Sequence, residues 1–315
     1  MSNSPESPRL VLLDSVVVDV TFRIDALPER GSDTYVNESV ALAGGGFNVM
    51  SAASRLGLSA VYGGVVGTGP FASIALRAMR DEGIVVALEP VVVQDTGYVI
   101  VMLEPDGERT FLSIGGAEAT LTAAQLASVV IWPRDFVYFS GYSMLFESNR
   151  QALVERLPSL PDAVTLVFDP GPLVDRISET ALRAIYERVD WFSCNAREAE
   201  LLTGIADPTR SAEDLLLRLG RGGVVVRTGE EGCVVAPRGH GAQAVAGFPV
   251  SVVDSNGAGD CHVGAFMALL ANGRCPVESA EMANAAAALS VTKRGPATGP
   301  TRAQLHEFLT LHQRA

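Results

Sequence analysis

The sequence predicts an α/β protein with a doubly wound, mostly parallel β-sheet that is flanked by helices on both faces. Two observations predict this fold. Short runs of Val, Leu, Ile and Phe alternate along the 315-residue chain with stretches of helical period, as in successive β–α–β units. The first run, at 10–18, is largely β-branched and apolar, which is typical of a strand buried on both of its faces.

The individual elements follow from local pattern. A strand is indicated by a short apolar run, and a helix by apolar residues that recur every three to four positions. In one such stretch Phe71, Ile74, Ala75, Ala78 and Met79 fall on one side of a helix. Strands are expected at 10–18, 60–66, 136–139, 164–168, 191–193 and 223–227, and helices at 49–58, 71–82, 149–157, 178–189, 197–203 and 211–219.

Two stretches without helical period, 20–43 and 90–116, interrupt the alternation. Both are rich in Val, Thr and Tyr and contain turn residues. Pro105-Asp106-Gly107 predicts a hairpin turn between two strands. We therefore expect a single domain, 1–315, on which the two stretches build a small inserted β lid.

The balance of charge excludes several classes of function. The chain has 24 Lys and Arg against 36 Asp and Glu, a formal charge of −12, which argues against nucleic-acid and anionic-membrane partners. No segment approaches the ~20 apolar residues of a membrane span, and the N-terminus lacks a basic leader, so a cytoplasmic protein is expected. The single lysine, Lys293, lies outside any Gly-Lys-Ser/Thr sequence, which excludes a P-loop.

The segment 254–260, Asp-Ser-Asn-Gly-Ala-Gly-Asp, is the most informative part of the chain. An apolar stretch at 250–253, expected to be a strand, precedes it, and a helical stretch at 261–271 follows it. Glycines let a backbone approach a ligand closely, and a helix N-terminus presents unpaired N–H groups and the positive end of the helix dipole. The segment therefore predicts a phosphate site built from the amides of Gly257, Ala258 and Gly259.

Asp260 follows this predicted phosphate site directly. A carboxylate in the first turn of a helix is commonly a capping residue. Beside a phosphate, however, it would repel the ligand unless it faced a proton donor such as a substrate hydroxyl. This arrangement predicts a phosphoryl-transfer reaction in which Asp260 is the general base.

Four segments together resemble the ribokinase-like, or PfkB, family of carbohydrate kinases. The segment 254–260, with Gly264 and Ala265, resembles the C-terminal signature of that family, and 43–48, Ala-Gly-Gly-Gly-Phe-Asn, resembles its N-terminal signature. The segment 195–198 is similar to its Asn-x-x-Glu element, and 284–295 is a fourth match. They occur in family order over nearly the whole chain, and the two β stretches fall where the family has its lid.

The resemblance implies a ribokinase-like fold, an ATP-dependent sugar kinase activity and Mg²⁺ as the metal ion. It makes Asp260 the catalytic base, with Gly257, Ala258 and Gly259 as the anion hole. The other positions that it matches are Asp19, Gly44, Gly45 and Asn48 for the sugar; Asn195, Thr228, Gly229, Gly232 and Asn284 for the nucleotide; Glu198 for Mg²⁺, through water; and Asp254 and Asn256 for the monovalent cation, K⁺, of some members.

Two further substrate-contact candidates come from position alone. Tyr142 follows a strand end, where doubly wound sheets bind ligands, although an ordinary loop aromatic is the alternative. Arg109 lies on the lid hairpin, where the alternative is a solvated charge.

The identity of the substrate stays open at this level. Gly45 stands where ribokinases proper commonly have a lysine, so ribose is not assigned. A nucleoside kinase of the same fold and a catalytically silent protein that binds a sugar or nucleotide are the alternatives. Lid strands that pair across a two-fold axis would make a homodimer.

Overall fold

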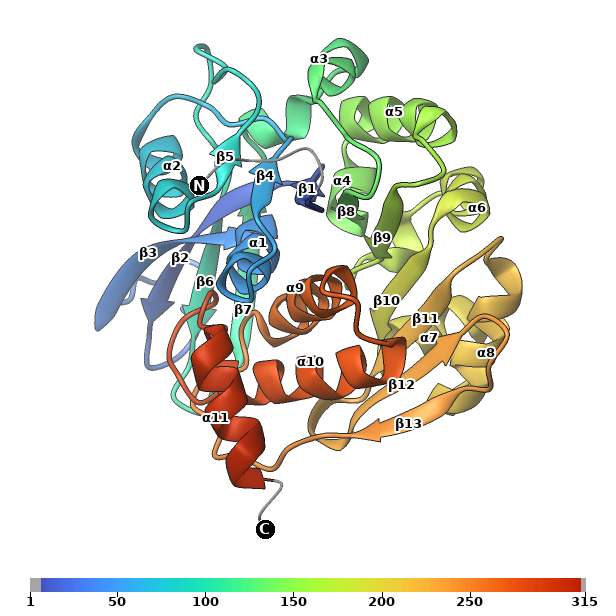
Figure 1. Ribbon diagram of the computed structural model, residues 1–315. Coiled ribbons are helices and arrows are strands. Elements are labelled where there is room, and N and C mark those ends of the chain that lie inside the picture. Colours follow the sequence, from blue (N-terminus) through green and yellow to red (C-terminus); the bar gives the residue numbers. More distant parts are fainter. Residues whose placement is uncertain (1–6, 313–315) are drawn as a thin grey trace.

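The computed structural model describes residues 7–312 and contains one large and one small β-sheet (Figure 1). The large sheet has the strand order β13-β12-β11-β10-β9-β8-β1-β4-β5. Its strands from β11 to β5 in this order are parallel, and β12 and β13 add antiparallel at one edge. The strands are β1 (Leu10–Leu12), β4 (Ala60–Tyr62), β5 (Val85–Val86), β8 (Phe136–Ser140), β9 (Thr165–Asp169), β10 (Trp191–Asn195), β11 (Gly223–Arg227), β12 (Gly232–Pro237) and β13 (Gln243–Ala246).

Helices cover both faces of the large sheet and bury two separate apolar cores against it. One core includes residues of α1 (Gly46–Arg55), α2 (Pro70–Asp81), α9 (Ala258–Ala271), α10 (Pro276–Ser290) and α11 (Arg302–His312). The other includes residues of α3 (Ala123–Ser128), α4 (Gly141–Leu145), α5 (Glu147–Arg156), α6 (Glu179–Arg188), α7 (Ala196–Thr203) and α8 (Pro208–Arg218). In β1, Leu10 and Leu12 face the first core, and Val11 faces the second. The predicted fold class is therefore confirmed.

The run at 10–18 is not one strand, which corrects the expectation. The chain leaves the large sheet after Leu12 and enters the small sheet at Val16. Asp14 and Ser15 make the transition, because their polar groups are used locally: Asp14 accepts hydrogen bonds from Ser15 N and Ser143 Oγ, and Ser15 O accepts one from Gly46 N.

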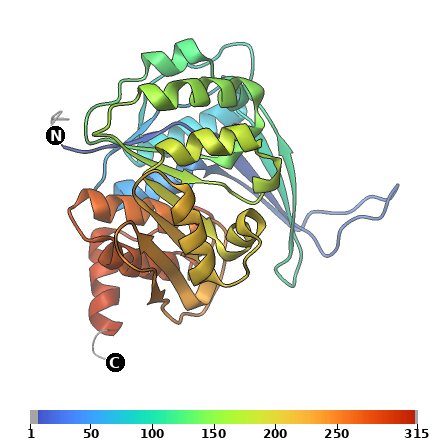
Figure 2. The ribbon, with the colours of Figure 1, turned by 90° about the vertical axis from the view of Figure 1, so that its right-hand side faces the viewer.

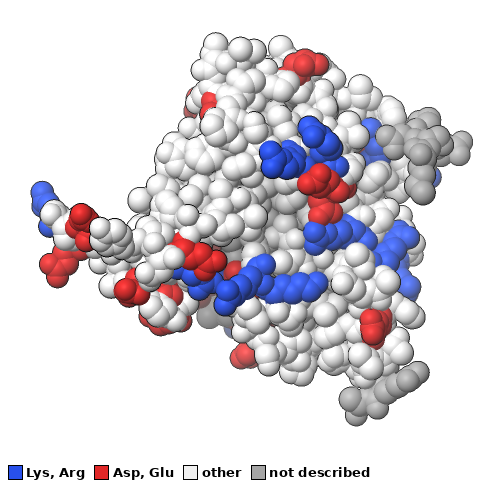
Figure 3. Space-filling model, turned by 90° about the vertical axis from the view of Figure 1, so that its left-hand side faces the viewer, with Lys and Arg blue, Asp and Glu red and all other residues white. Residues whose placement is uncertain are grey.

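The small sheet has the order β3-β2-β6-β7, with β2 (Val16–Arg23), β3 (Glu38–Gly45), β6 (Tyr98–Leu103) and β7 (Arg109–Ile114). The face of the small sheet that carries Tyr98 packs on α2, where the ring of Phe71 stacks on the ring of Tyr98 with 4.4 Å between the ring centroids. The connection between β2 and β3 projects far from the body of the protein (Figures 2 and 3). Among the helices of residues 7–312, none has the length and hydrophobicity that a membrane span requires.

The expected strand at 250–253 is wrong. The structure has no strand at this segment, and Val252 and Val253 are 65% and 55% exposed. It is held instead by the end of α10, where Val291 O accepts hydrogen bonds from the N–H groups of Val253 and Asp254 at 2.8 and 3.1 Å. The glycine-rich turn before α9 is thus fixed by a helix end.

Candidate active site

The carboxyl ends of five parallel strands meet at one edge of the large sheet. Polar residues stand at or just after these ends, where doubly wound sheets place their ligand sites. They are Asp14 after β1, Ser140 on β8, Asp169 on β9, Asn195 on β10 and Arg227 on β11. The start of α9 lies at the same edge, because a Cβ on Gly259 would stand 3.5 Å from Arg227 Nε.

Asp260 and Asn48 meet above this edge. Asn48 Nδ2 donates a 2.9 Å hydrogen bond to Asp260 Oδ2, which joins α1 to α9. The two helices approach closely at Gly264, where a Cβ would stand 2.4 Å from Val49 O. Glycine at this position therefore brings the residues of two distant motifs into contact.

The surroundings of Asp260 shift the pKa of its carboxyl group. Burial raises its pKa from 3.8 to about 7, and the charge of Asp169 adds to that rise. The Asn48 hydrogen bond and the charge of Arg227 oppose it. A carboxylate with a pKa near neutrality is suited to take and release a proton at physiological pH.

Unpaired backbone donors surround Asp260 at the helix start. Gly257 is the N-cap of α9, and the described residues give the N–H groups of Gly257, Gly259 and Asp260 no hydrogen-bond acceptor. The Ala258 N–H is used, since it donates to Ser255 O at 3.3 Å. Of the three predicted anion-hole residues, Gly257 and Gly259 thus have free N–H groups.

Asp19 lies on β2, on the face of the small sheet that is turned toward the α9 start. Burial raises its pKa to about 6, while a hydrogen bond from the Asn256 side chain lowers it. The carboxylate rests against Gly44, where a Cβ would stand 2.5 Å from Asp19 Oδ2. Any larger residue at position 44 would displace the carboxylate, whereas Gly45 serves as the N-cap of α1.

Asn48 also has an unsatisfied acceptor. Its Oδ1 is buried and has no donor among the described residues. A buried orphan acceptor beside the Asp260 carboxylate fits a ligand rich in hydroxyl groups, since each hydroxyl can donate one hydrogen bond.

A cavity of about 650 Å³ lies between the α9 start, α10 and the turn after β11. Of the predicted site residues, its lining includes Asn195, Gly229, Gly232, Ala258, Gly259 and Asn284. Thr228 does not line it; its N–H donates to Gly232 O at 2.8 Å and closes the turn before β12.

The side-chain amide of Asn284 is hydrogen-bonded within the wall of this cavity. Its Nδ2 donates to Val245 O and Ala246 O at 3.0 and 3.1 Å, so its Oδ1 is the group that accepts a 3.1 Å hydrogen bond from His262 Nε2. His262 is buried, and burial lowers its pKa to about 3, which keeps the ring neutral. No sequence motif pairs His262 with Asn284, so this contact was not predicted from the sequence.

Asn195 and Glu198 form a capping box at the start of α7. Glu198 accepts from Asn195 N at 2.8 Å and from Asn195 Nδ2 at 2.7 Å, and Asn195 Oδ1 accepts from Glu198 N. Both carboxylate oxygens of Glu198 are thus engaged within the capping box. Within residues 7–312 no cluster of three or more His, Cys, Asp or Glu could hold a metal ion.

Asp254 is already neutralised by a residue of the small sheet. Arg109 Nη2 of β7 contacts Asp254 Oδ1 at 2.5 Å, and Asp254 also accepts from Asn256 N at 3.0 Å and Gly295 N at 3.1 Å. K⁺ is expected from the sequence at Asp254 and Asn256, whereas the Arg109 guanidinium already supplies a positive charge beside Asp254. The residues present do not fit a monovalent cation at Asp254.

Tyr142, in the first turn of α4, lies near Asp260 and Asp169. It is 47% exposed, and burial together with the charges of Asp260 and Asp169 raises the pKa of its phenol to about 12.

Arg227 and Asp169 are two further site residues that were not predicted from the sequence. Arg227 Nη1 contacts Asp169 Oδ2 at 2.9 Å, and Arg227 lines the cavity. Arg227 ends the strand predicted at 223–227, and Asp169 directly follows the strand predicted at 164–168, so the strand-end argument used for Tyr142 applies equally to them.

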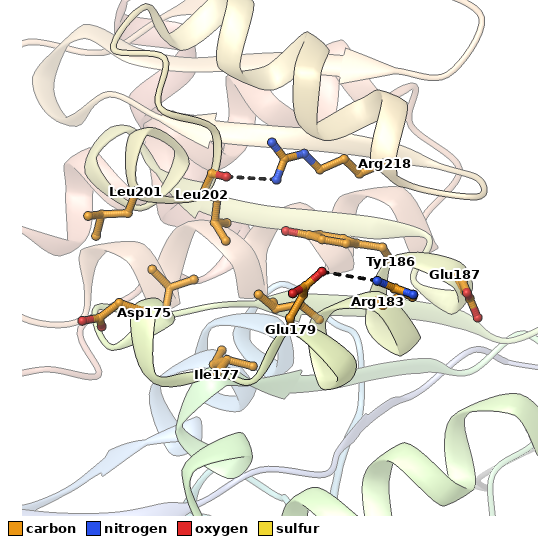
Figure 4. Close-up of a pocket in the computed structure, with 11 residues that line it drawn as sticks. Asp175, Ile177, Glu179, Arg183, Tyr186, Glu187, Leu201, Leu202 and Arg218 are labelled. Carbon is orange, nitrogen blue, oxygen red and sulfur yellow. Dashed lines mark hydrogen bonds and ion pairs between the residues drawn. The ribbon is translucent and has the colours of Figure 1, made fainter.

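A second hollow, of about 530 Å³, lies on the outer face between α6, α7 and α8 (Figure 4). Its lining includes Asp175, Arg183, Tyr186, Leu202 and Arg218, and none of the predicted site residues. Arg183 and Arg218 are paired there with Glu179 and the Leu202 carbonyl. The chemistry predicted from the sequence gathers at the strand ends instead.

Comparison with known proteins gives the same assignment as the motifs. Residues 7–303 match the family model of the pfkB family carbohydrate kinases. The uncharacterized sugar kinase YegV of Escherichia coli is 32% identical over 310 residues, covering 94% of this chain and 92% of that protein. Fructokinase-1 of Zea mays is 30% identical over 287 residues, covering 83% and 86%.

Solved structures share the fold. Ribokinase from Thermotoga maritima superposes with a TM-score of 0.81 at 21% identity, covering 96% of this chain and 99% of its own. The nucleoside kinase of Methanocaldococcus jannaschii has a TM-score of 0.80 at 18% identity, covering 97% and 99%. The family model and the relatives agree along nearly the whole described chain, and the protein belongs to the pfkB family of carbohydrate kinases.

Proposed function

We propose that the protein transfers the γ-phosphoryl group of ATP to a hydroxyl of a small sugar, with Asp260 as the general base. One observation carries this proposal: a carboxylate with a pKa near neutrality stands in the first turn of α9, beside free N–H groups and a hydrogen-bonded asparagine. Free amides suit a phosphate, and the carboxylate and the orphan Asn48 Oδ1 suit hydroxyl groups.

The chemistry then follows from the positions of these groups. The acceptor hydroxyl donates to Asp260, which takes the proton as the oxygen attacks the γ-phosphorus. The N–H groups of Gly257 and Gly259 face the charge that develops on the phosphoryl oxygens. Mg²⁺ supplies counter-charge to the ATP phosphates when it is bound. The small sheet acts as a lid that excludes water, which would otherwise compete as the acceptor.

A nucleoside acceptor is a second candidate, and one observation favours it. The strand register places Phe111 and Leu42 on the same face of the small sheet as Asp19, and both are partly exposed, at 53% and 41%. An apolar surface beside a hydroxyl-binding carboxylate suits a sugar that carries a base. The nucleoside kinase of Methanocaldococcus jannaschii shares the fold.

A panel of sugars and nucleosides, assayed for ADP release with Mg·ATP, tests the proposal. We expect at least one acceptor to be turned over, and Asp260→Asn to lower kcat by about 10²–10⁴ while ATP binding is retained. Full kcat in Asp260→Asn would refute the role of the base. Binding of ATP without turnover of any acceptor would favour a catalytically silent protein.

A further inference from the structure

Arg227 stands between the strand ends and the start of α9. It is the last residue of β11, and its side chain is 13% exposed. Four elements converge on the guanidinium: β9 through Asp169, β10 through Ser193, α7 through Glu198 and α9 through Gly259. Because four elements surround the guanidinium, its orientation is fixed.

The donors of the guanidinium are divided between the protein and the site. Nη1 is used, since it contacts Asp169 Oδ2 at 2.9 Å and donates to Ser193 Oγ at 2.5 Å. The described residues give Nε no hydrogen-bond acceptor, and Nη2 has only the Glu198 carboxylate, 3.9 Å away. These two atoms lie 3.5 and 3.6 Å from where a Cβ on Gly259 would stand. The free edge of the guanidinium, Nε and Nη2, therefore lies next to Gly259 at the α9 start.

Arg227 also supplies the positive charge in the lining of the cavity. Of the described residues that line the cavity, it is the only Lys or Arg. Arg109 is committed to Asp254, and Lys293 and Arg294 are exposed. Burial alone would lower the pKa of Arg227, but the charges of Asp169 and Glu198 raise it, so the guanidinium stays charged.

We propose that Arg227 is a catalytic residue that binds the phosphoryl group in transfer through Nε and Nη2, and that Asp169 is the positioning residue that aims it. This inference rests on the proposed kinase function. A planar fork of two N–H donors matches two oxygens of a phosphate. The acceptor oxygen forms a bond to phosphorus, the bond to the β–γ bridging oxygen breaks, and its electron pair leaves with ADP. The proton goes to Asp260, and Arg227 stabilises the charge on the phosphoryl oxygens without exchanging an atom.

Binding measurements test this role without knowledge of the acceptor. For Arg227→Gln we expect the Kd of a non-hydrolysable ATP analogue to rise at least tenfold, while the Kd of ADP changes less than threefold, both with Mg²⁺. Arg221→Gln is the matched control. Arg221 lies just before β11, on the side of the strand opposite to its Arg227 end, and pairs with Asp190 at 2.8 Å, so its loss removes an ion pair outside the cavity. Equal changes for the analogue and ADP would overturn the proposal.

Turnover gives the second test, with any acceptor that the panel identifies. We expect Arg227→Gln to lower kcat by about 10²–10³, and Arg227→Lys, which keeps the charge but not the fork, to recover only part of it. Asp169→Asn is expected to lower kcat with little change in the KM of the acceptor. If Arg227→Gln fails to fold, the Arg227→Lys values decide: wild-type kcat and analogue affinity would refute the proposal. Failure of the wild-type chain to phosphorylate any acceptor would instead refute the proposed function.

Discussion

Asn48 and Asp260 are 212 positions apart in the chain, and a 2.9 Å hydrogen bond joins their side chains. This bond couples the helix that follows the first glycine-rich segment to the helix that follows the second. It also favours the ionised form of a carboxyl group whose burial favours the protonated form. The pKa of Asp260, about 7, results from this opposition.

The first prediction concerns the pH dependence of the reaction. Because the base must be ionised, kcat/KM is expected to fall as the pH decreases below about 7. Asn48→Ala removes the hydrogen bond that lowers the pKa, so the acid limb of the profile moves to higher pH. Asp169→Asn removes a charge that raises the pKa, so the limb moves to lower pH. The control is Ser51→Ala, a buried change on α1, which leaves the limb in place. If the acid limb of the kcat/KM profile fell at the same pH in the wild type and all three variants, Asp260 would be excluded as the titrating group.

The second prediction concerns stability. The pKa of Asp260 is about 7 in the folded protein against an ordinary 3.8, so the folded state holds its proton more tightly. The stabilisation that this tighter proton binding by Asp260 gives to the folded state is therefore fully present below pH 3.8 and is lost as the pH rises through 7. Asp260→Asn does not titrate, so its Tm should exceed that of the wild type at pH 8, with a gap that closes toward pH 4. Thermal unfolding across this range checks the sign, and a gap independent of pH would contradict it.

Sequence patterns predicted the parallel sheet because short apolar runs and helical periods are local signals. They failed where contacts between distant segments decide the structure. The apolar run at 10–18 is divided between two sheets by the hydrogen bonds of Asp14 and Ser15. The stretch at 250–253 lacks a partner strand and binds the end of α10. Arg227 and Asp169 belong to no motif, and their pairing depends on the adjacency of β9, β10 and β11.

The third prediction concerns Glu198. Both of its carboxylate oxygens are engaged by Asn195, and Arg227 lies 3.9 Å away. Glu198→Gln replaces one acceptor oxygen by a donor, which weakens the cap and removes a charge near the ATP phosphates. We expect a lower Tm and a higher Mg²⁺ concentration for half-maximal rate. Glu179→Gln, in the first turn of α6 and highly exposed, is the control. A lower Tm with an unchanged Mg²⁺ titration would restrict Glu198 to the helix cap.

The fourth prediction concerns self-association. Leu112 and Ile114 of the edge strand β7 are 52% and 38% exposed, on the face of the small sheet opposite Asp19. An exposed apolar edge strand favours pairing with a second copy. Sedimentation is expected to give a dimer, and Leu112→Glu a monomer. Val130→Glu, which alters an exposed apolar residue outside the small sheet, should leave the dimer intact. A monomeric wild-type protein would contradict the prediction.

The last prediction concerns the contact between Arg109 and Asp254, which ties the small sheet to the turn before α9. Because the guanidinium already neutralises Asp254, we expect the wild-type rate to be the same in K⁺ and in tetramethylammonium. A partly exposed ion pair contributes up to about 1 kcal/mol, so Arg109→Gln should raise the KM of the acceptor by about twofold to fivefold with little change in kcat. Arg23→Gln removes an exposed pair with Glu38 on the same sheet and should change neither value. Strong activation of the wild type by K⁺ would show that a cation displaces Arg109 from Asp254, and would restore the expectation drawn from the sequence.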